Sequence, residues 1–170
     1  MKIEMLKYPT DKDWEFTKLC TLNTIGKKSM VKPPDDGWKK RLLESGHSPI
    51  RTLWFAFRME IPYWVSVHFV RHKIGIEHFV ESQRNDRQNK YNRNEALQNE
   101  IVSHVMYVNA DELIKMCHAR LCKQASPETQ DVMKKIVELV LETNPEFKTV
   151  LVPRCVYRNG KCTEFFPCNK

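Results

Sequence analysis

An apolar segment that changes abruptly into a run of charged residues places the strongest constraint on how this chain folds. Residues 62–70 are mostly apolar, and Arg71, His72 and Lys73 follow them directly. Cationic side chains at the end of a buried segment need anions or water as partners. A phosphate or pyrophosphate suits this pattern, because guanidinium and ammonium groups supply both donors and charge. A solvated helix end, where cations suit the helix dipole, is the alternative.

The composition indicates one globular domain. The chain has 170 residues, of which 41% are hydrophobic, enough to bury a sizeable core. We expect residues 1–150 to form a single domain and residues 151–170 to form a cysteine-containing tail. No stretch resembles a membrane span or the apolar region of a signal peptide, so a cytoplasmic protein with reduced cysteines is expected.

The net charge of +7 and the pI of about 9.1 favour an anionic partner. Lysines and arginines are dispersed along the chain and form no long basic block. The densest basic segment, residues 84–93, has few aromatic side chains on which bases could stack. A pocket for small phosphorylated ligands is therefore favoured over a nucleic-acid surface.

The pattern along the chain predicts helices and strands in alternation. Residues 2–7 are expected to form a strand and residues 11–25 a helix that ends at Gly26. Asp35 or Asp36 is expected to cap a second helix that stops at Gly46. Apolar side chains on both faces of residues 53–57 predict a strand that is buried on both sides.

The second half of the chain carries further start and stop signals. Pro62 is expected to begin a helix on which Val65, Phe69 and His72 share a face. Residues 102–108 fit either a strand or the end of a buried helix. Asn109 then predicts a helix cap with a carboxylate three residues later, and Ser126-Pro127 predicts a helix that ends near residue 144.

The charged run resembles the signature of the flavin-dependent thymidylate synthases, an Arg-His-Arg triplet followed by Ser-x-Arg. Here the triplet is Arg71-His72-Lys73 and the second part is Ser82-Gln83-Arg84. Lys73 stands where the family has arginine, and eight residues rather than seven separate the two parts.

Two further blocks extend the resemblance over roughly residues 42–141. Gly46-His47-Ser48-Pro49 precedes a strand and a helix, as in the family, and Asn109-Ala110, Arg120, Ala125 and Glu128 match a later block. Asp111 and Lys115 differ from the flavin-contacting side chains that other members carry there. The resemblance implies the family's α/β (α+β) fold, with an antiparallel or mixed sheet and flanking helices.

The resemblance also implies a reaction, the reductive methylation of deoxyuridine monophosphate (dUMP) to thymidine monophosphate (dTMP). Methylenetetrahydrofolate would be the carbon donor, and FAD, reduced by NADPH, would carry the hydride. The family's active sites lie between the subunits of a homotetramer. An enzyme that makes another 5-modified pyrimidine nucleotide, or a non-catalytic nucleic-acid-binding or zinc-binding module, are the alternatives.

The family motif implies roles for individual residues. Ser82 and Arg120 are the expected catalytic residues. The expected substrate-binding residues are His68, Arg71, Glu81, Ser82, Gln83, Arg84, Arg93 and Arg120. The expected flavin-binding residues are His47, Ser48, Arg71, His72, Lys73, Ile74, Asn109 and Gln124.

The tail contains Cys155, Cys162 and Cys168, which are weak candidates for zinc ligands. No CxxC pair is present, so free thiols are the favoured interpretation and no metal site is predicted.

Overall fold

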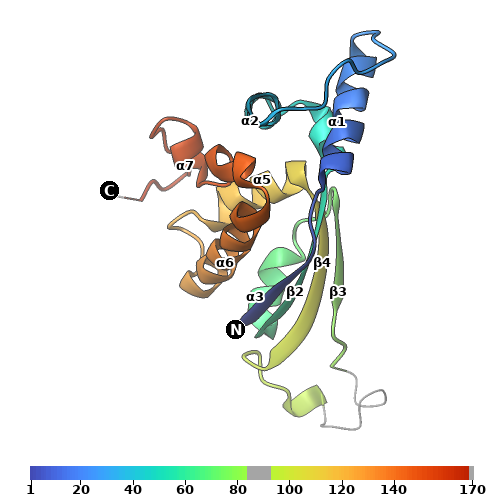
Figure 1. Cartoon of the computed structure of the whole chain (residues 1–170). Coiled ribbons are helices and arrows are strands. Elements are labelled where there is room, and N and C mark those ends of the chain that lie inside the picture. Colours follow the sequence, from blue (N-terminus) through green and yellow to red (C-terminus); the bar gives the residue numbers. More distant parts are fainter. Residues whose placement is uncertain (84–92, 169–170) are drawn as a thin grey trace.

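The computed structural model describes residues 1–83 and 93–168, with the side chain of Arg93 excluded. The predicted substrate residue Arg84 and the side chain of Arg93 therefore lie outside the described residues. The chain folds around a four-stranded sheet of order β1-β2-β4-β3, in which every pairing is antiparallel (Figure 1). The strands are β1 (Lys2–Lys7), β2 (Trp54–Pro62), β3 (Ile76–Val80) and β4 (Ile101–Asn109).

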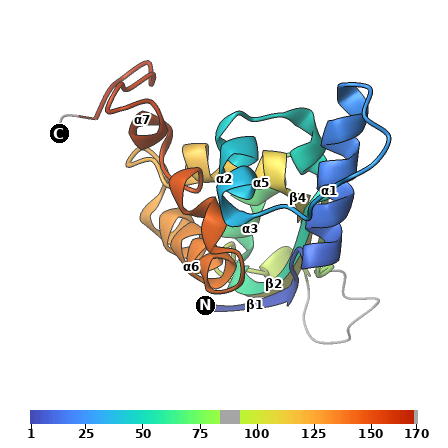
Figure 2. The same ribbon diagram turned by 45° about the horizontal axis from the view of Figure 1, so that its top comes forward.

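Helices precede, connect and follow the strands of this sheet. The α-helices are α1 (Asp11–Thr24), α2 (Asp36–Glu44), α3 (Tyr63–Phe69), α5 (Ala110–Arg120), α6 (Pro127–Thr143) and α7 (Arg154–Tyr157). Short 3-10 helices are η1 (Ser48–Thr52), η2 (Arg93–Glu95) and η3 (Pro145–Thr149). Helix α6 lies beside α5 and next to β1 (Figure 2). The predicted α+β class is confirmed, and the sheet is antiparallel throughout.

The predicted helix caps are confirmed. The Asp35 carboxylate accepts from the Trp38 backbone N–H, Asn109 caps α5 through the Glu112 N–H, and Ser126 caps α6 with Pro127 in the first turn. These side chains satisfy donors that the first turn of a helix leaves unpaired.

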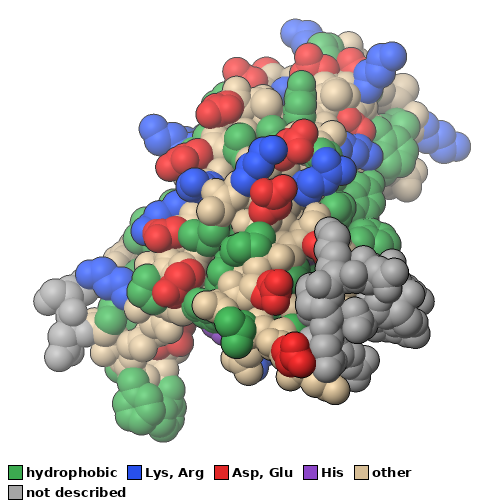
Figure 3. Space-filling view, turned by 90° about the horizontal axis from the view of Figure 1, so that it is seen from below, with side chains coloured by type: hydrophobic (Ala, Val, Ile, Leu, Met, Phe, Trp, Pro, Cys, Tyr) green, Lys and Arg blue, Asp and Glu red, His purple; other side chains and the backbone are tan. Residues whose placement is uncertain are grey.

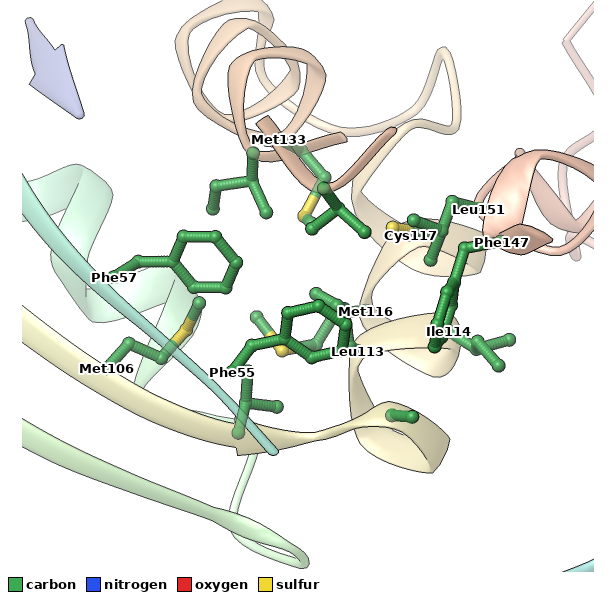
Figure 4. Packing of buried hydrophobic residues seen from close by; sticks show 14 of the residues in the cluster. Phe55, Phe57, Met106, Leu113, Ile114, Met116, Cys117, Met133, Phe147 and Leu151 are labelled. Carbon is green, nitrogen blue, oxygen red and sulfur yellow. The ribbon is translucent and has the colours of Figure 1, made fainter. Parts of the chain in front are cut away.

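The core lies between the sheet and the helices α5 and α6. Phe55 and Phe57 of β2 and Met106 of β4 point toward Leu113 of α5 and Met133 of α6 (Figure 4). All five side chains are fully buried. This packing makes α5 a fixed element with one face in the core.

The prediction that residues 53–57 are buried on both sides was wrong. Phe55 and Phe57 are fully buried, but Trp54 and Ala56 lie on a half-exposed face of the sheet, where Trp54 stacks on Tyr107 at 4.6 Å. The described helices pack on one face only, as in many antiparallel sheets.

Helix α3 is shorter than the sequence suggested. Pro62 ends β2 and occupies the N-cap position of α3, and the helix stops at Phe69, so His72 lies in the segment that follows and not on the helix. Residues 102–108 belong to a strand, β4, which settles the alternative left open for them. Strand β3, which the sequence pattern did not predict, pairs with β4 from Ile76 to Val80.

Charged side chains of both signs are interspersed on the surface seen in Figure 3. No single basic patch dominates this face, despite the net charge of +7. Within residues 1–83 and 93–168, every helix is too short or too polar to cross a lipid bilayer.

Candidate active site

The triplet lies in a loop that is held against the first turn of α5. The Asn109 backbone N–H donates to the Gly75 carbonyl oxygen at 2.9 Å. Gly75 has a φ of +75°, and a Cβ at this position would overlap the side-chain amide of Asn109. Only glycine combines this backbone conformation with such close contact. The loop therefore lies directly on the helix terminus.

His72, the centre of the triplet, joins both ends of α5. Its Nδ1 lies 2.7 Å from Glu112 Oε1, in the first turn of the helix. Its Nε2 lies 3.2 Å from Arg120 Nε, in the last turn. Glu112 is buried with 7% of its surface exposed, and His72 is half-buried. The family resemblance assigned His72 to the flavin and Arg120 to the substrate, and the structure brings the two side chains into contact.

Arg120 has no acidic partner in the part of the chain that the structure describes. Its Nε donates to His72, and its Nη2 donates to the His68 carbonyl oxygen at 2.8 Å. Burial, followed by repulsion from Arg71, lowers the pKa of Arg120. A half-buried guanidinium whose partners are neutral, close to a second cation, is an arrangement that an anionic ligand would stabilise.

His68 joins the same network to α6. Its Nδ1 lies 2.8 Å from the Thr129 hydroxyl, which in turn lies 2.8 Å from the Ser126 hydroxyl. Burial, followed by the charges of Arg120 and Arg71, lowers the pKa of His68. The ring is therefore favoured in its neutral form, which retains one hydrogen-bond donor.

A second histidine pair supports the triplet loop from the sheet. His78 on β3 donates through Nε2 to the His72 carbonyl oxygen at 3.0 Å, and its Nδ1 lies 2.9 Å from Nε2 of His104 on β4. His104 is fully buried, and burial lowers its pKa to about 4, with a smaller contribution from His78. These two rings link the triplet loop to the core through hydrogen bonds.

The remaining triplet side chains face solvent. Arg71 and Lys73 are exposed, and neither forms an ion pair with any residue in the ranges 1–83 and 93–168. Ile74, another predicted flavin contact, is 80% exposed. These side chains are accessible to a ligand outside the core.

The predicted substrate segment follows β3. The Glu81 backbone N–H donates to the Ser103 carbonyl oxygen at 2.7 Å, and the Glu81 carboxylate accepts from the Ser103 N–H at 3.0 Å. Glu81 therefore extends the pairing of this edge beyond β3. Ser82 and Gln83 are half-buried, and the buried Nε2 of Gln83 has no hydrogen-bond partner among the described residues.

His47 and Ser48 lie at the start of η1, which packs beside α5. The buried Nδ1 of His47 has no hydrogen-bond partner within residues 1–83 and 93–168. Such orphaned polar atoms and the unpaired cations of the triplet fit a polar, anionic cofactor such as FAD.

The two departures from the family pattern contact each other. Asp111 Oδ2 accepts from Lys115 at 3.0 Å and from Arg51 at 2.8 Å. Burial alone would raise the pKa of Asp111, but the hydrogen bonds from Lys115 and Arg51 outweigh it and hold the pKa below its usual range. The cation at 115 is thus paired within the protein.

The tail lies apart from these contacts. Gln124, a predicted flavin contact, is exposed and donates to the Phe166 carbonyl oxygen at 3.0 Å. Cys155, Cys162 and Cys168 line a cavity of about 510 Å³ together with Cys122. All four are free thiols, and no three His, Cys, Asp or Glu side chains of the described residues are grouped to hold a metal ion.

Sequence reasoning missed four members of the network. Glu112 was identified only as a capping carboxylate, and Thr129, His78 and His104 were not singled out. The Asn109–Glu112 spacing was the available signal for Glu112. The two sheet histidines are brought together by strand pairing, which their distance along the chain does not reveal.

The fold matches two solved nucleotide enzymes. One is thymidylate synthase X (ThyX) from Helicobacter pylori, in a crystal structure with FAD and dUMP, with a TM-score of 0.67, 10% identity, and coverage of 89% of this chain and 99% of that chain. The other is the UMP/dUMP methylase PolB from Streptomyces cacaoi, bound with 5-Br dUMP, with a TM-score of 0.67, 14% identity, and coverage of 89% and 96%. No family model and no curated protein matches the sequence. The chain therefore has the ThyX fold that its motifs suggested.

Proposed function

We propose that this protein is a flavin-dependent enzyme that binds dUMP and modifies its pyrimidine ring. The observation that carries the proposal is Arg120, a half-buried guanidinium with neutral partners beside the cation of Arg71. The fold shared with ThyX and PolB, whose structures contain dUMP or its 5-bromo analogue, supports a uridylate as the anion.

Arg120 is assigned to the substrate. Its Nε and Nη2 are already engaged, while its Nη1 donors have no partner among the described residues. Those donors would bind a pyrimidine carbonyl and stabilise negative charge that develops on the ring during the reaction. Ser82, half-buried after β3, would donate a further hydrogen bond to the substrate. Arg84 and Arg93 are proposed as phosphate ligands.

The residues at the triplet loop and η1 are assigned to FAD. Arg71 and Lys73 would supply positive charge, and His47 would give its orphaned Nδ1 a partner. His72, Ser48, Ile74 and Asn109 are proposed as further contacts to the cofactor. Gln124 is proposed to contact it after its hydrogen bond to the Phe166 carbonyl oxygen is broken. The bound flavin would carry hydride and one-carbon units, which no side chain can do.

The finer proposal is reductive methylation of dUMP to dTMP, with methylenetetrahydrofolate as carbon donor and NADPH as reductant. A homotetramer with shared active sites is part of this proposal. Exposed apolar side chains on the β3 edge, such as Phe79 at 63% exposure, are suitable for contact with another copy.

A second candidate is an enzyme that makes a different 5-modified pyrimidine nucleotide. It is favoured by the equal TM-score of the methylase PolB and by the Asp111–Lys115 pair at positions where synthases contact flavin. Mass spectrometry of the product separates the two reactions, because dTMP alone supports the synthase.

The first test is binding. We expect absorbance of added FAD to be perturbed by the protein and then by dUMP, and calorimetry to detect dUMP. Arg120→Ala and Ser82→Ala are each expected to abolish turnover with the fold retained. Arg58→Ala is a matched control, because Arg58 lies on the sheet and pairs with the exposed Glu4. Near-wild-type turnover of Arg120→Ala would contradict the proposed role of Arg120.

A further inference from the structure

A buried carboxylate and the proposed substrate arginine lie on the same helix and are joined by one imidazole. Glu112 is in the first turn of α5 and Arg120 in the last, and His72 contacts both. We propose that Glu112 is a positioning residue that fixes the tautomer of His72 and, through it, the orientation of the Arg120 guanidinium. The tautomer stands on geometry alone, whereas its consequence for nucleotide binding rests on the proposed function.

The donors and acceptors determine the tautomer. The Nε–H of an arginine can only donate, so His72 Nε2, 3.2 Å away, must be the unprotonated acceptor. The ring proton therefore lies on Nδ1 and is donated to Glu112 Oε1 at 2.7 Å. The opposite tautomer would place two N–H groups against each other at Arg120 and leave a bare nitrogen at the carboxylate.

The backbone that carries the carboxylate is firmly held. The Glu112 backbone N–H is capped by Asn109 Oδ1 at 3.0 Å, and its side chain lies at the helix N-terminus, where negative charge is favoured. The neighbouring residues Leu113 and Met116 are fully buried in the core (Figure 4). The backbone at Glu112 therefore cannot shift without displacing α5.

The guanidinium is fixed by two bonds in its plane. His72 accepts from Nε, and the His68 carbonyl oxygen accepts from Nη2 at 2.8 Å. Two such bonds leave the planar group little rotational freedom. The free Nη1 donors are thereby pre-oriented, which lowers the entropic cost of binding a ligand.

Three variants test this relay, the chain of contacts from Glu112 through His72 to Arg120. Glu112→Ala removes the acceptor, Glu112→Gln keeps a carbonyl acceptor of the same size, and Glu138→Ala is a control on the exposed face of α6. The readouts are the ¹⁵N shifts of the two His72 ring nitrogens, which report the tautomer without any ligand, and the dUMP affinity by calorimetry. We expect the Nδ1–H tautomer in the wild type, in Glu112→Gln and in Glu138→Ala.

Glu112→Ala is expected to lose this tautomer and to bind dUMP about 10–100-fold more weakly, by analogy with the loss of metal affinity or activity when the partner that orients a metal-ligating histidine is removed. Glu112→Gln should restore affinity to within a few-fold of the wild type. An Nε2–H tautomer in the wild type would overturn the proposal without any variant. Unchanged tautomer and affinity in a folded Glu112→Ala would also overturn it.

The two proposals fail separately. If the wild type has the Nδ1–H tautomer and Glu112→Ala loses it, the relay is supported even when no dUMP binds, and only the proposed function is refuted. If the wild type binds dUMP and Glu112→Ala binds it equally well, the proposed function survives and the positioning role is refuted.

Discussion

Mild acid is expected to destabilise this protein through His104. This side chain is fully buried on β4, and burial lowers its pKa from 6.5 to about 4. Its Nε2–H donates to His78 Nδ1, because His78 Nε2 already donates to the His72 carbonyl oxygen. A second proton would have to bind His104 Nδ1, which is buried without a hydrogen-bond partner among the described residues.

The sign and size of the effect follow from the two pKa values. Between pH 6.5 and 4 the unfolded chain binds a proton at His104 that the folded protein does not, so stability falls as the pH falls. At about pH 5 this single group is expected to reduce the free energy of unfolding by about 2 kcal/mol relative to pH 7.5.

Urea unfolding at the two pH values measures the loss. His68, His78 and His118 also have lowered pKa values, so the wild-type slope contains several histidines. His104→Gln keeps a donor for His78 but cannot titrate, and it should show a pH-dependent loss smaller by about 2 kcal/mol. Tyr107→Phe, on the opposite face of β4, should keep the wild-type slope. An unchanged slope in His104→Gln would refute the reasoning.

Three further outcomes are expected. Gly75→Ala should lower the free energy of unfolding by about 3 kcal/mol, and Gly26→Ala by only about 1 kcal/mol. Both glycines have a φ of +75°, but only a Cβ at position 75 would overlap the Asn109 side chain. Equal losses for the two variants in urea unfolding would contradict this. Burial raises the pKa of the Cys117 thiol, so iodoacetamide should leave it unmodified in the native protein, and mass spectrometry detecting native labelling would be inconsistent with that burial. Elemental analysis should find far less than one zinc per chain, and stoichiometric zinc that Cys162→Ser removes would disprove this.

The local signals in the sequence were sufficient for the ends of most elements. The strand at residues 2–7 and the caps at Asn109 and Ser126 were predicted correctly, and of the two candidates Asp35 and Asp36 it is Asp35 that caps α2. Caps and prolines act within one turn of a helix, so their effect does not depend on distant residues. The charged triplet and the later motif block were likewise enough to suggest the ThyX fold, which the structural comparison confirms.

Strand pairing and the packing of helices decided the rest. Residues 76–80 form strand β3 because they pair with β4. The weak pattern of these five residues does not by itself predict a strand or its partner. The exposure of Trp54 depends on which face of the sheet the helices cover. The sequence by itself identified Arg71, His72 and Arg120 as candidate site residues. Only the tertiary structure placed Glu112 against His72, because residues forty positions apart meet through folding and not through any local rule.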